Sequence, residues 1–379
     1  MKKTLAAIVC LLALLPVGAK TPADTMPDRA ETLKTLIRVN DLYMRRHPDP
    51  GAMIPYYSRN KMYEGNIWTR GIYFEGLMDL YGIYPDNKYL DYAMDWADKH
   101  RWGMRADNTA TRNADNYCCA QTYIDLYRLR PEPHMLTKTK ACMNMLVNTP
   151  QVDDWTWIDA IQMGMPVLAK LARETGDQAY NDKAHAMYMY ARDELAGGLY
   201  NPKESLWWRD KDFVPPYKEP NGANCYWSRG NGWVVAALAR VLDELPADSP
   251  YRKAYEKDLR DMLAALVRCQ REDGFWNVSL HDPTNYGGKE TTGTALFVYA
   301  MAWAVRNGLV DREEYMPVIA RAWNGIMRQA IHRNGNIGYV QGTGKEPKDG
   351  QPVAFDSKPD FDDFGTGCVL LAGAQVYRL

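Results

Sequence analysis

The stretch Trp227-Ser-Arg-Gly-Asn-Gly-Trp233 recurs in outline along the chain, six times in all. Each copy opens with an aromatic or acidic residue, passes a glycine or another small residue, and continues as an apolar helix. Self-similarity of this kind indicates repeated supersecondary units. If the six helices lie side by side, their Trp, Arg, Asp and Glu side chains converge at one end, which is the composition of a sugar site. The other copies begin at Trp68, Ala114, Trp157, Glu290 and Asp362.

Helical periodicity dominates the chain. Apolar residues recur at the spacing of a helix face, and strand patterns are few. The pattern predicts helices at about 29–46, 70–82, 87–101, 115–129, 134–148, 158–174, 179–195, 229–244, 250–270, 291–307, 311–330 and 363–377.

Two kinds of helix alternate in this series. The helices that begin with the repeated motif are nearly uncharged over long runs, such as 163–171 and 234–242, as a helix buried on all sides should be. The helices between them are amphipathic, with charges on one face, as in 251–263. Six buried and six amphipathic helices in alternation predict an inner ring within an outer ring. We therefore predict an all-α fold, an (α/α)6 barrel of six helical hairpins.

Three connecting segments predict short β-hairpins in the loops. They span 198–209, 273–283 and 334–341, and each combines a Gly or Asn turn with aromatic or β-branched residues. Loops of this kind, long for a tight helix pair, usually carry function at a barrel mouth.

The first residues have the pattern of a secretory signal. Lys2 and Lys3 form a charged region, an apolar run follows from Leu5 to Pro16, and small residues precede Lys20. The run is too short for a spanning helix of about 20 residues. We predict a cleaved signal peptide at 1–19, a single (α/α)6-barrel catalytic domain at 20–379, and export to the periplasm or the medium.

Charge and composition narrow the classes of partner. The formal net charge is −1, which argues against nucleic acid and against an anionic membrane, since both need clustered Lys and Arg. The chain has 12 Trp and 25 Tyr but only 7 Phe. Trp and Tyr combine an apolar face with a polar group, as sugars do. A small-molecule oligosaccharide is therefore the predicted partner, although aromatic packing of a large helical protein is the simpler alternative.

The cysteines do not suggest a metal or a disulfide framework. Six remain after the signal segment, most of them within predicted helices, and their spacing does not suit zinc. Adjacent Cys118 and Cys119 are poorly placed for disulfides, so buried free thiols are expected. Nucleotide-binding and serine-hydrolase motifs are also missing from the sequence. We therefore predict no metal and no cofactor.

Asp115 and Asp159 are the predicted catalytic pair. Each lies in the first turn of an inner helix, in adjacent hairpins, so both point toward one cavity. Two carboxyl groups that face one bond are what glycoside cleavage usually needs. Trp157 beside Asp159 would desolvate the carboxyl group and raise its pKa, as a general acid requires. The alternative is that each Asp only caps its helix.

Aromatic and charged residues at other inner-helix starts are the predicted substrate-binding residues. The planar guanidinium of Arg229 matches a carboxylate, and the indoles of Trp227 and Trp233 would stack on a sugar ring. The alternative places Arg229 between two core tryptophans. Trp68 and Arg70 repeat this pattern at the second helix. Glu290 is a weaker candidate, because a carboxylate at a helix start is more often a cap.

The motifs resemble those of a known family. Trp157-x-Asp159 followed by Met163 and Pro166, the string Trp227-x-Arg229-Gly-Asn-Gly-Trp233, and Asp115 twelve residues before Tyr127 are similar to the unsaturated glucuronyl and rhamnogalacturonyl hydrolases, glycoside hydrolase families 88 and 105. The resemblance covers most of the chain and implies an (α/α)6 barrel.

The resemblance also implies a reaction. These enzymes remove a 4,5-unsaturated uronic acid from the non-reducing end of lyase-generated oligosaccharides by acid-catalysed hydration of the vinyl ether double bond. By this likeness Asp159 is the acid/base, Asp115 is a supporting carboxylate, and Trp227, Arg229 and Trp233 line the site.

One departure concerns specificity. Family members often carry a His in the segment that matches 198–204, where this chain has none, and Trp207-Trp208-Arg209 follows instead. Two other functions are compatible with the residues: a conventional inverting glycosidase on uronide or neutral glycans, and a non-catalytic glycan-binding barrel. The sequence indicates neither the polysaccharide, nor the linkage, nor the oligomeric state.

Overall fold

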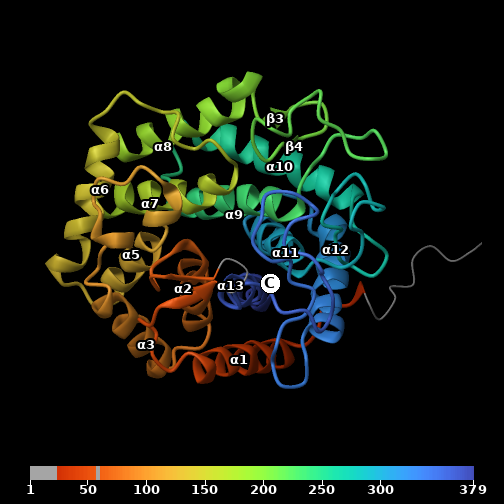
Figure 1. Ribbon diagram of the computed structural model, residues 1–379, viewed down its shortest axis with the longest axis horizontal. Helices are drawn as coiled ribbons and strands as arrows, with labels where there is room; N and C mark the ends of the chain where they lie inside the picture. Colours follow the sequence, from red (N-terminus) through yellow and green to blue (C-terminus); the bar gives the residue numbers. More distant parts are fainter. Residues whose placement is uncertain (1–23, 57–59) are drawn as a thin grey trace, which may run out of the picture.

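Helices arranged in two concentric rings make up the computed structural model, which describes residues 24–56 and 60–379 (Figure 1). The predicted signal peptide at 1–19 lies outside the described residues. The inner ring consists of α2 (Trp68–Tyr81), α4 (Ala114–Tyr117) with α5 (Ala120–Leu129), α7 (Asp159–Thr175), α9 (Ser228–Glu244), α11 (Thr291–Arg306) and α13 (Asp363–Tyr377). The outer ring consists of α1 (Arg29–Arg46), α3 (Asn87–Lys99), α6 (Thr137–Val147), α8 (Ala179–Met189), α10 (Arg252–Arg268) and α12 (Arg312–Gly325).

The burial of each helix follows from its sequence. Every residue of α11 except Arg306 is buried, because its run of small and apolar side chains meets neighbours on all sides. In α10 the buried residues form one stripe, and the charged residues other than Asp258 lie outside it. The predicted (α/α)6 barrel is confirmed. Among the described helices, none combines the length and apolar character needed to cross a membrane.

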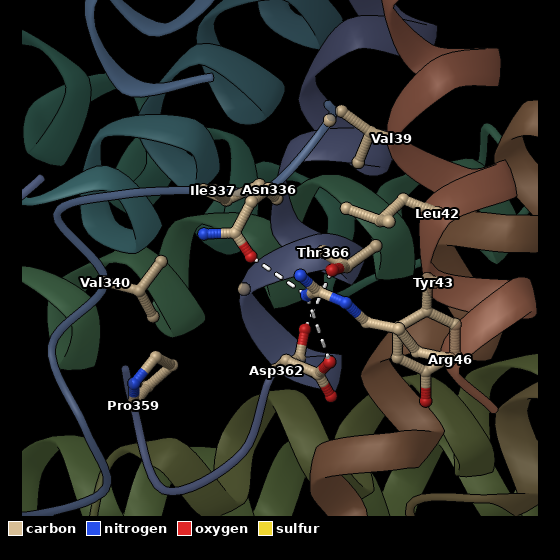
Figure 2. Close-up of a pocket in the computed structure, with 12 residues that line it drawn as sticks. Val39, Leu42, Tyr43, Arg46, Asn336, Ile337, Val340, Pro359, Asp362 and Thr366 are labelled. Atoms are coloured by element: carbon tan, nitrogen blue, oxygen red, sulfur yellow. Dashed lines mark hydrogen bonds and ion pairs between the residues drawn. The ribbon is translucent and has the colours of Figure 1, made fainter. Parts of the chain in front are cut away.

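The inner ring closes where the last inner helix meets the first. α13 packs against both α2 and α11, and α1 packs against α13. Gly76 of α2 and Gly367 of α13 lie at the closest approach, where a Cβ on Gly76 would lie 2.5 Å from the carbonyl oxygen of Gly367. Near the start of α13, Arg46 of α1 donates to Asn336 over 2.9 Å and lies 3.8 Å from Asp362 (Figure 2).

The helix boundaries agree closely with the predicted ones, with one interruption. The predicted helix at 115–129 divides into α4 and α5 at Cys118 and Cys119. Both thiols are buried and free, and Cys118 Sγ lies 3.6 Å from Glu75 Oε1. The expectation of buried free thiols is confirmed for five of the six cysteines, while Cys269 is partly exposed. Shorter 3-10 and π-helical segments are Arg105–Asp107, Pro133–Leu136, Tyr190–Glu194, Leu195–Gly197 and Ile326–Ala330.

The loop hairpins differ from the prediction. β3 (Tyr200–Asn201) and β4 (Leu206–Trp207) confirm the hairpin at 198–209. β1 (Ile54–Tyr56) and β2 (Lys61–Tyr63) form a second, unpredicted hairpin.

Of the other two predicted hairpins, the one at 273–283 is wrong and the one at 334–341 is present only as a short hairpin that begins earlier. The segment at 273–283 bridges to the starts of two inner helices, through the pairs Trp276–Glu290 and Ser279–Trp227. The segment at 334–341 contributes the single bridge Ile331–Ile337. In the first segment the backbone groups bond to residues distant in sequence, since the Val278 carbonyl accepts from Ser228 and the Leu280 N–H donates to Tyr226. In the second, the N–H groups of His332 and Gly338 donate to the carbonyls of Asn336 and Ala330, each over 2.8 Å, so a short hairpin does close there, from an earlier start than predicted.

Candidate active site

A cavity of about 430 Å³ opens at the N-terminal ends of the inner helices. Asp115, Asp159, Trp68 and Trp157 line it, so the structure brings together the two predicted catalytic residues and two of the predicted aromatic residues. They come from three different inner hairpins. The convergence expected from the repeated motifs is therefore present in the fold.

Neither of the two predicted catalytic residues is the N-cap of its helix. The N-cap of α4 is Asn113, whose side chain accepts the N–H of Asp115 over 2.9 Å. The N-cap of α7 is Ile158, and Asp159 is the first residue of the helix. Asp159 is 8% exposed, and its Oδ2 has no hydrogen-bond partner among the described residues. A buried carboxylate oxygen without a partner costs folding free energy, so its presence calls for a functional explanation. This geometry favours the catalytic interpretation over the capping alternative.

Burial makes both carboxyl groups weaker acids. It raises the pKa of Asp115 to about 7, and the nearby charge of Asp159 adds to the increase, whereas Arg209 and Arg105 oppose it. Burial likewise raises the pKa of Asp159, against the opposing effect of Arg209 and Arg229. A carboxyl pair of this kind holds a proton near neutral pH, so the cavity has an acid available for proton transfer.

Arg209 is the main site residue that the sequence analysis did not select. Its Nε lies 3.5 Å from Asp159 Oδ2, and its Nη1 donates to Asp210 over 2.6 Å. Its position is set by the exit from β4, because the N–H of Ile158 donates to the Arg209 carbonyl and Trp157 pairs with Asp210. One feature of the sequence marked Arg209 as a candidate, because it follows the segment where the family His is missing. The pairing with the start of α7 is visible only in the fold.

Other cavity residues come from loops that carry weak sequence signals. The unpredicted β1–β2 hairpin contributes two tyrosines, and a loop before α13 contributes a hydroxyl group and a cation. Arg105 reaches the cavity from a 3-10 turn, with its guanidinium 4.8 Å from the ring centre of Tyr63. These additional lining residues are Tyr56, Tyr63, Arg105, Thr343, Lys345, Asp349 and Phe361.

The motif around Arg229 lies beneath the cavity, where it holds the loop at 341–342. Arg229 is buried, and its Nη1 and Nη2 donate to the carbonyl oxygens of Gln341 and Gly342, each over 2.7 Å. Trp227 is buried as well and donates through Nε1 to Gln341. Trp233 is buried and makes a T-shaped ring contact with Trp68. The described residues that line the cavity include none of these three. The alternative of a stacked, buried Arg229 is the one that the structure favours.

Arg70 and Glu290 also have structural roles in place of the predicted substrate contacts. Arg70 is buried and donates to the carbonyl oxygens of Pro50 and Ala52, which anchors the chain before β1. Glu290 is the N-cap of α11 and accepts the N–H groups of Thr292 and Gly293 over 3.0 and 2.6 Å. Glu290 therefore caps its helix, as the alternative interpretation of the sequence proposed.

Replacing Glu290 by Ala is expected to lower the free energy of unfolding by about 2 kcal/mol, at the upper end of cap losses. The substitution leaves two buried N–H groups without acceptors. Urea unfolding followed by circular dichroism measures the effect. Asp311→Ala, which removes the exposed cap of α12, is the matched control and should cost less. Equal losses for both variants would contradict the assigned role of Glu290.

Two carboxyl groups that line one cavity are the arrangement that most glycoside-cleaving enzymes use. The chain belongs to Glycosyl Hydrolase Family 88, whose family model matches residues 36–379, and it is a glycoside hydrolase. The unsaturated 3S-rhamnoglycuronyl hydrolase of Formosa agariphila is 32% identical over 335 residues, covering 82% of this chain and 84% of that relative.

Solved structures show the same architecture. A glycosyl hydrolase family 88 protein from Bacteroides vulgatus is 32% identical, with a TM-score of 0.84 over 93% of this chain and 99% of that one. A protein described as a polysaccharide lyase is 33% identical, with a TM-score of 0.83 over 92% of this chain and 97% of that one.

Proposed function

We propose that this protein removes a 4,5-unsaturated uronic acid from the non-reducing end of oligosaccharides that polysaccharide lyases produce. The observation that carries the proposal is the pair Asp115 and Asp159 in one cavity, with burial raising the pKa of both. The named activity of the relative from Formosa agariphila supports it.

The residues supply a proton and a place for water. Asp159 donates its proton to C4 of the vinyl ether, and the cation that develops at C5 is stabilised by the ring oxygen. Water adds at C5 and gives up a proton to the carboxylate pair, which restores the acid. The resulting hemiketal opens, and the next sugar leaves as the free alcohol. One water is consumed and the double bond disappears.

Ultraviolet absorbance of the conjugated enol acid tests this proposal directly. Lyase digests of pectin, glycosaminoglycan and ulvan are incubated with the enzyme, and absorbance should fall on at least one of them. A rise on the undigested polymer would indicate a lyase, the description given to one solved relative. Sugar release with constant absorbance would indicate a conventional inverting glycosidase. Either result overturns the proposal.

The rate should depend on pH through the carboxyl pair. Because burial raises the pKa of Asp159, the acid keeps its proton to higher pH than an ordinary carboxyl group, and activity is lost as pH rises through that raised pKa. The measurement is kcat/KM against pH on the unsaturated substrate. In Asp115→Asn the fall should begin at lower pH, because like charges raise each other's pKa. A rate that stays constant across neutral pH would contradict the assignment.

We also propose that the protein is exported and acts in the periplasm or the medium. The support is the signal pattern at 1–19, with cleavage before Lys20. Mass spectrometry of the protein from its native compartment should find Lys20 as the first residue. A protein that retains Met1 would contradict export by this route.

A further inference from the structure

Arg209 occupies an unusual position for a cation in a catalytic cavity. One edge of its guanidinium is held, because Nη1 donates to Asp210 over 2.6 Å. Nε faces Asp159 at 3.5 Å without donating a hydrogen bond to it, and Nη2 donates to no group among the described residues. The side chain is 19% exposed and lines the cavity. The guanidinium therefore has Nη1 anchored on Asp210, Nε buried against Asp159, and Nη2 left for a ligand.

The other cations near the cavity each interact with another group of the protein. Arg229 has both Nη groups on backbone carbonyls. Arg105 stacks over Tyr63 and reaches Asn116 at 3.5 Å. Lys345 pairs with Asp212 at 3.1 Å. Among the described residues that line the cavity, Arg209 is the cation that contacts Asp159, and its planar guanidinium is the group best matched to a carboxylate.

We propose that Arg209 binds the carboxylate of the unsaturated uronate and, by exchanging its ion pair with Asp159 for one with the substrate, leaves Asp159 free to act as the acid. This inference rests on the proposed function and names the residue that selects the charged substrate. Arg209 takes the role that the sequence analysis gave to Arg229. Binding of the charged substrate therefore releases Asp159 from its ion pair with Arg209. A neutral sugar bound in the same place leaves that ion pair intact.

The charges around Asp159 make this exchange effective. Asp115 of α4 and Asp210 face it as negative groups, while Arg209 and Arg229 of α9 face it as positive groups. Burial and the negative groups raise the pKa of Asp159, and Arg209 is the first of the opposing charges. A carboxylate on Arg209 offsets that charge, so the pKa of Asp159 rises further when the charged substrate binds.

The test compares an unsaturated disaccharide with its methyl ester, which has the double bond but no charge. Wild type should prefer the free acid, and Arg209→Met should reduce that preference in kcat/KM by about 10- to 100-fold, the usual loss for a charge-assisted hydrogen bond. Arg209→Lys should retain part of it. Because the ester changes intrinsic reactivity equally for every variant, the ratio of the two preferences isolates the contribution of Arg209. Lys211→Met, the loss of an exposed cation two residues away, should leave the preference unchanged.

A second measurement needs only wild type. On the free acid, the alkaline limb of kcat should lie at higher pH than that of kcat/KM, since the first reports the complex and the second the free enzyme. On the ester the two limbs should coincide. An unchanged preference in Arg209→Met, or limbs that coincide on the free acid, would overturn the inference. If wild type consumed the double bond of neither compound, the proposed function itself would fail, which is a distinct result.

Discussion

Replacing Asp159 by Asn is expected to lower kcat by about 100- to 10,000-fold, the usual contribution of a positioned general acid. The amide keeps the shape of the carboxyl group and cannot donate the proton to C4. Asp159 is the first residue of α7, is 8% exposed and faces a cavity of about 430 Å³. Because the change is nearly isosteric, substrate affinity should remain within a few-fold of wild type, so the loss falls on kcat and not on KM.

Absorbance kinetics give kcat, and calorimetric titration with the unsaturated disaccharide gives the affinity of the inactive variant. Asp153→Asn, an exposed position in the loop before α7, is the matched control and should retain full activity. Asp115→Asn should fall between the two, because it removes a supporting carboxylate and leaves the acid. Full activity in Asp159→Asn would exclude Asp159 as the acid.

Replacing Gly367 by Ala is expected to lower the free energy of unfolding by about 1–3 kcal/mol, the range for overpacking a tight core. A Cβ at this position of α13 would overlap the backbone of α2, where the carbonyl carbon of Ile72 lies 2.6 Å away. Ala is the better helix former by roughly 1 kcal/mol. The overlap outweighs this gain, because both partners are backbone in closed inner helices and neither can move alone.

Gly365→Ala provides the control in the same helix. Its Cβ would meet the methyl groups of Val340 at 3.1 Å, which are side-chain atoms that can shift. The gain in helix propensity should therefore leave stability nearly unchanged. Urea unfolding monitored by tryptophan fluorescence compares the two variants with wild type. Equal stability of Gly367→Ala and wild type would contradict the prediction, because it would mean that α2 and α13 can move apart without a loss of free energy of unfolding.

The sequence by itself determined the fold class and the convergence of Asp115 and Asp159 at one end of the barrel. Alternating buried and amphipathic helices leave few arrangements other than two rings, because a helix that is apolar all round must be covered all round. The same repeat predicts that Asp115 and Asp159 lie at one end of the barrel, since equivalent positions of parallel helices lie at the same height. These inferences use local periodicity alone, which is why the structure confirms them.

Only the tertiary structure decided which charged residues face the cavity. Arg229 and Arg209 are both arginines beside tryptophans in the sequence, yet Arg229 is covered by the loop at 341–342, whereas Arg209 enters the cavity beside Asp159. The difference depends on loops that pair with segments distant along the chain, such as 209–210 with 157–158. Hydrogen bonds of this kind carry no sequence period. The physical reason is that a side chain's role in a site depends on which of its donors the rest of the fold has already satisfied.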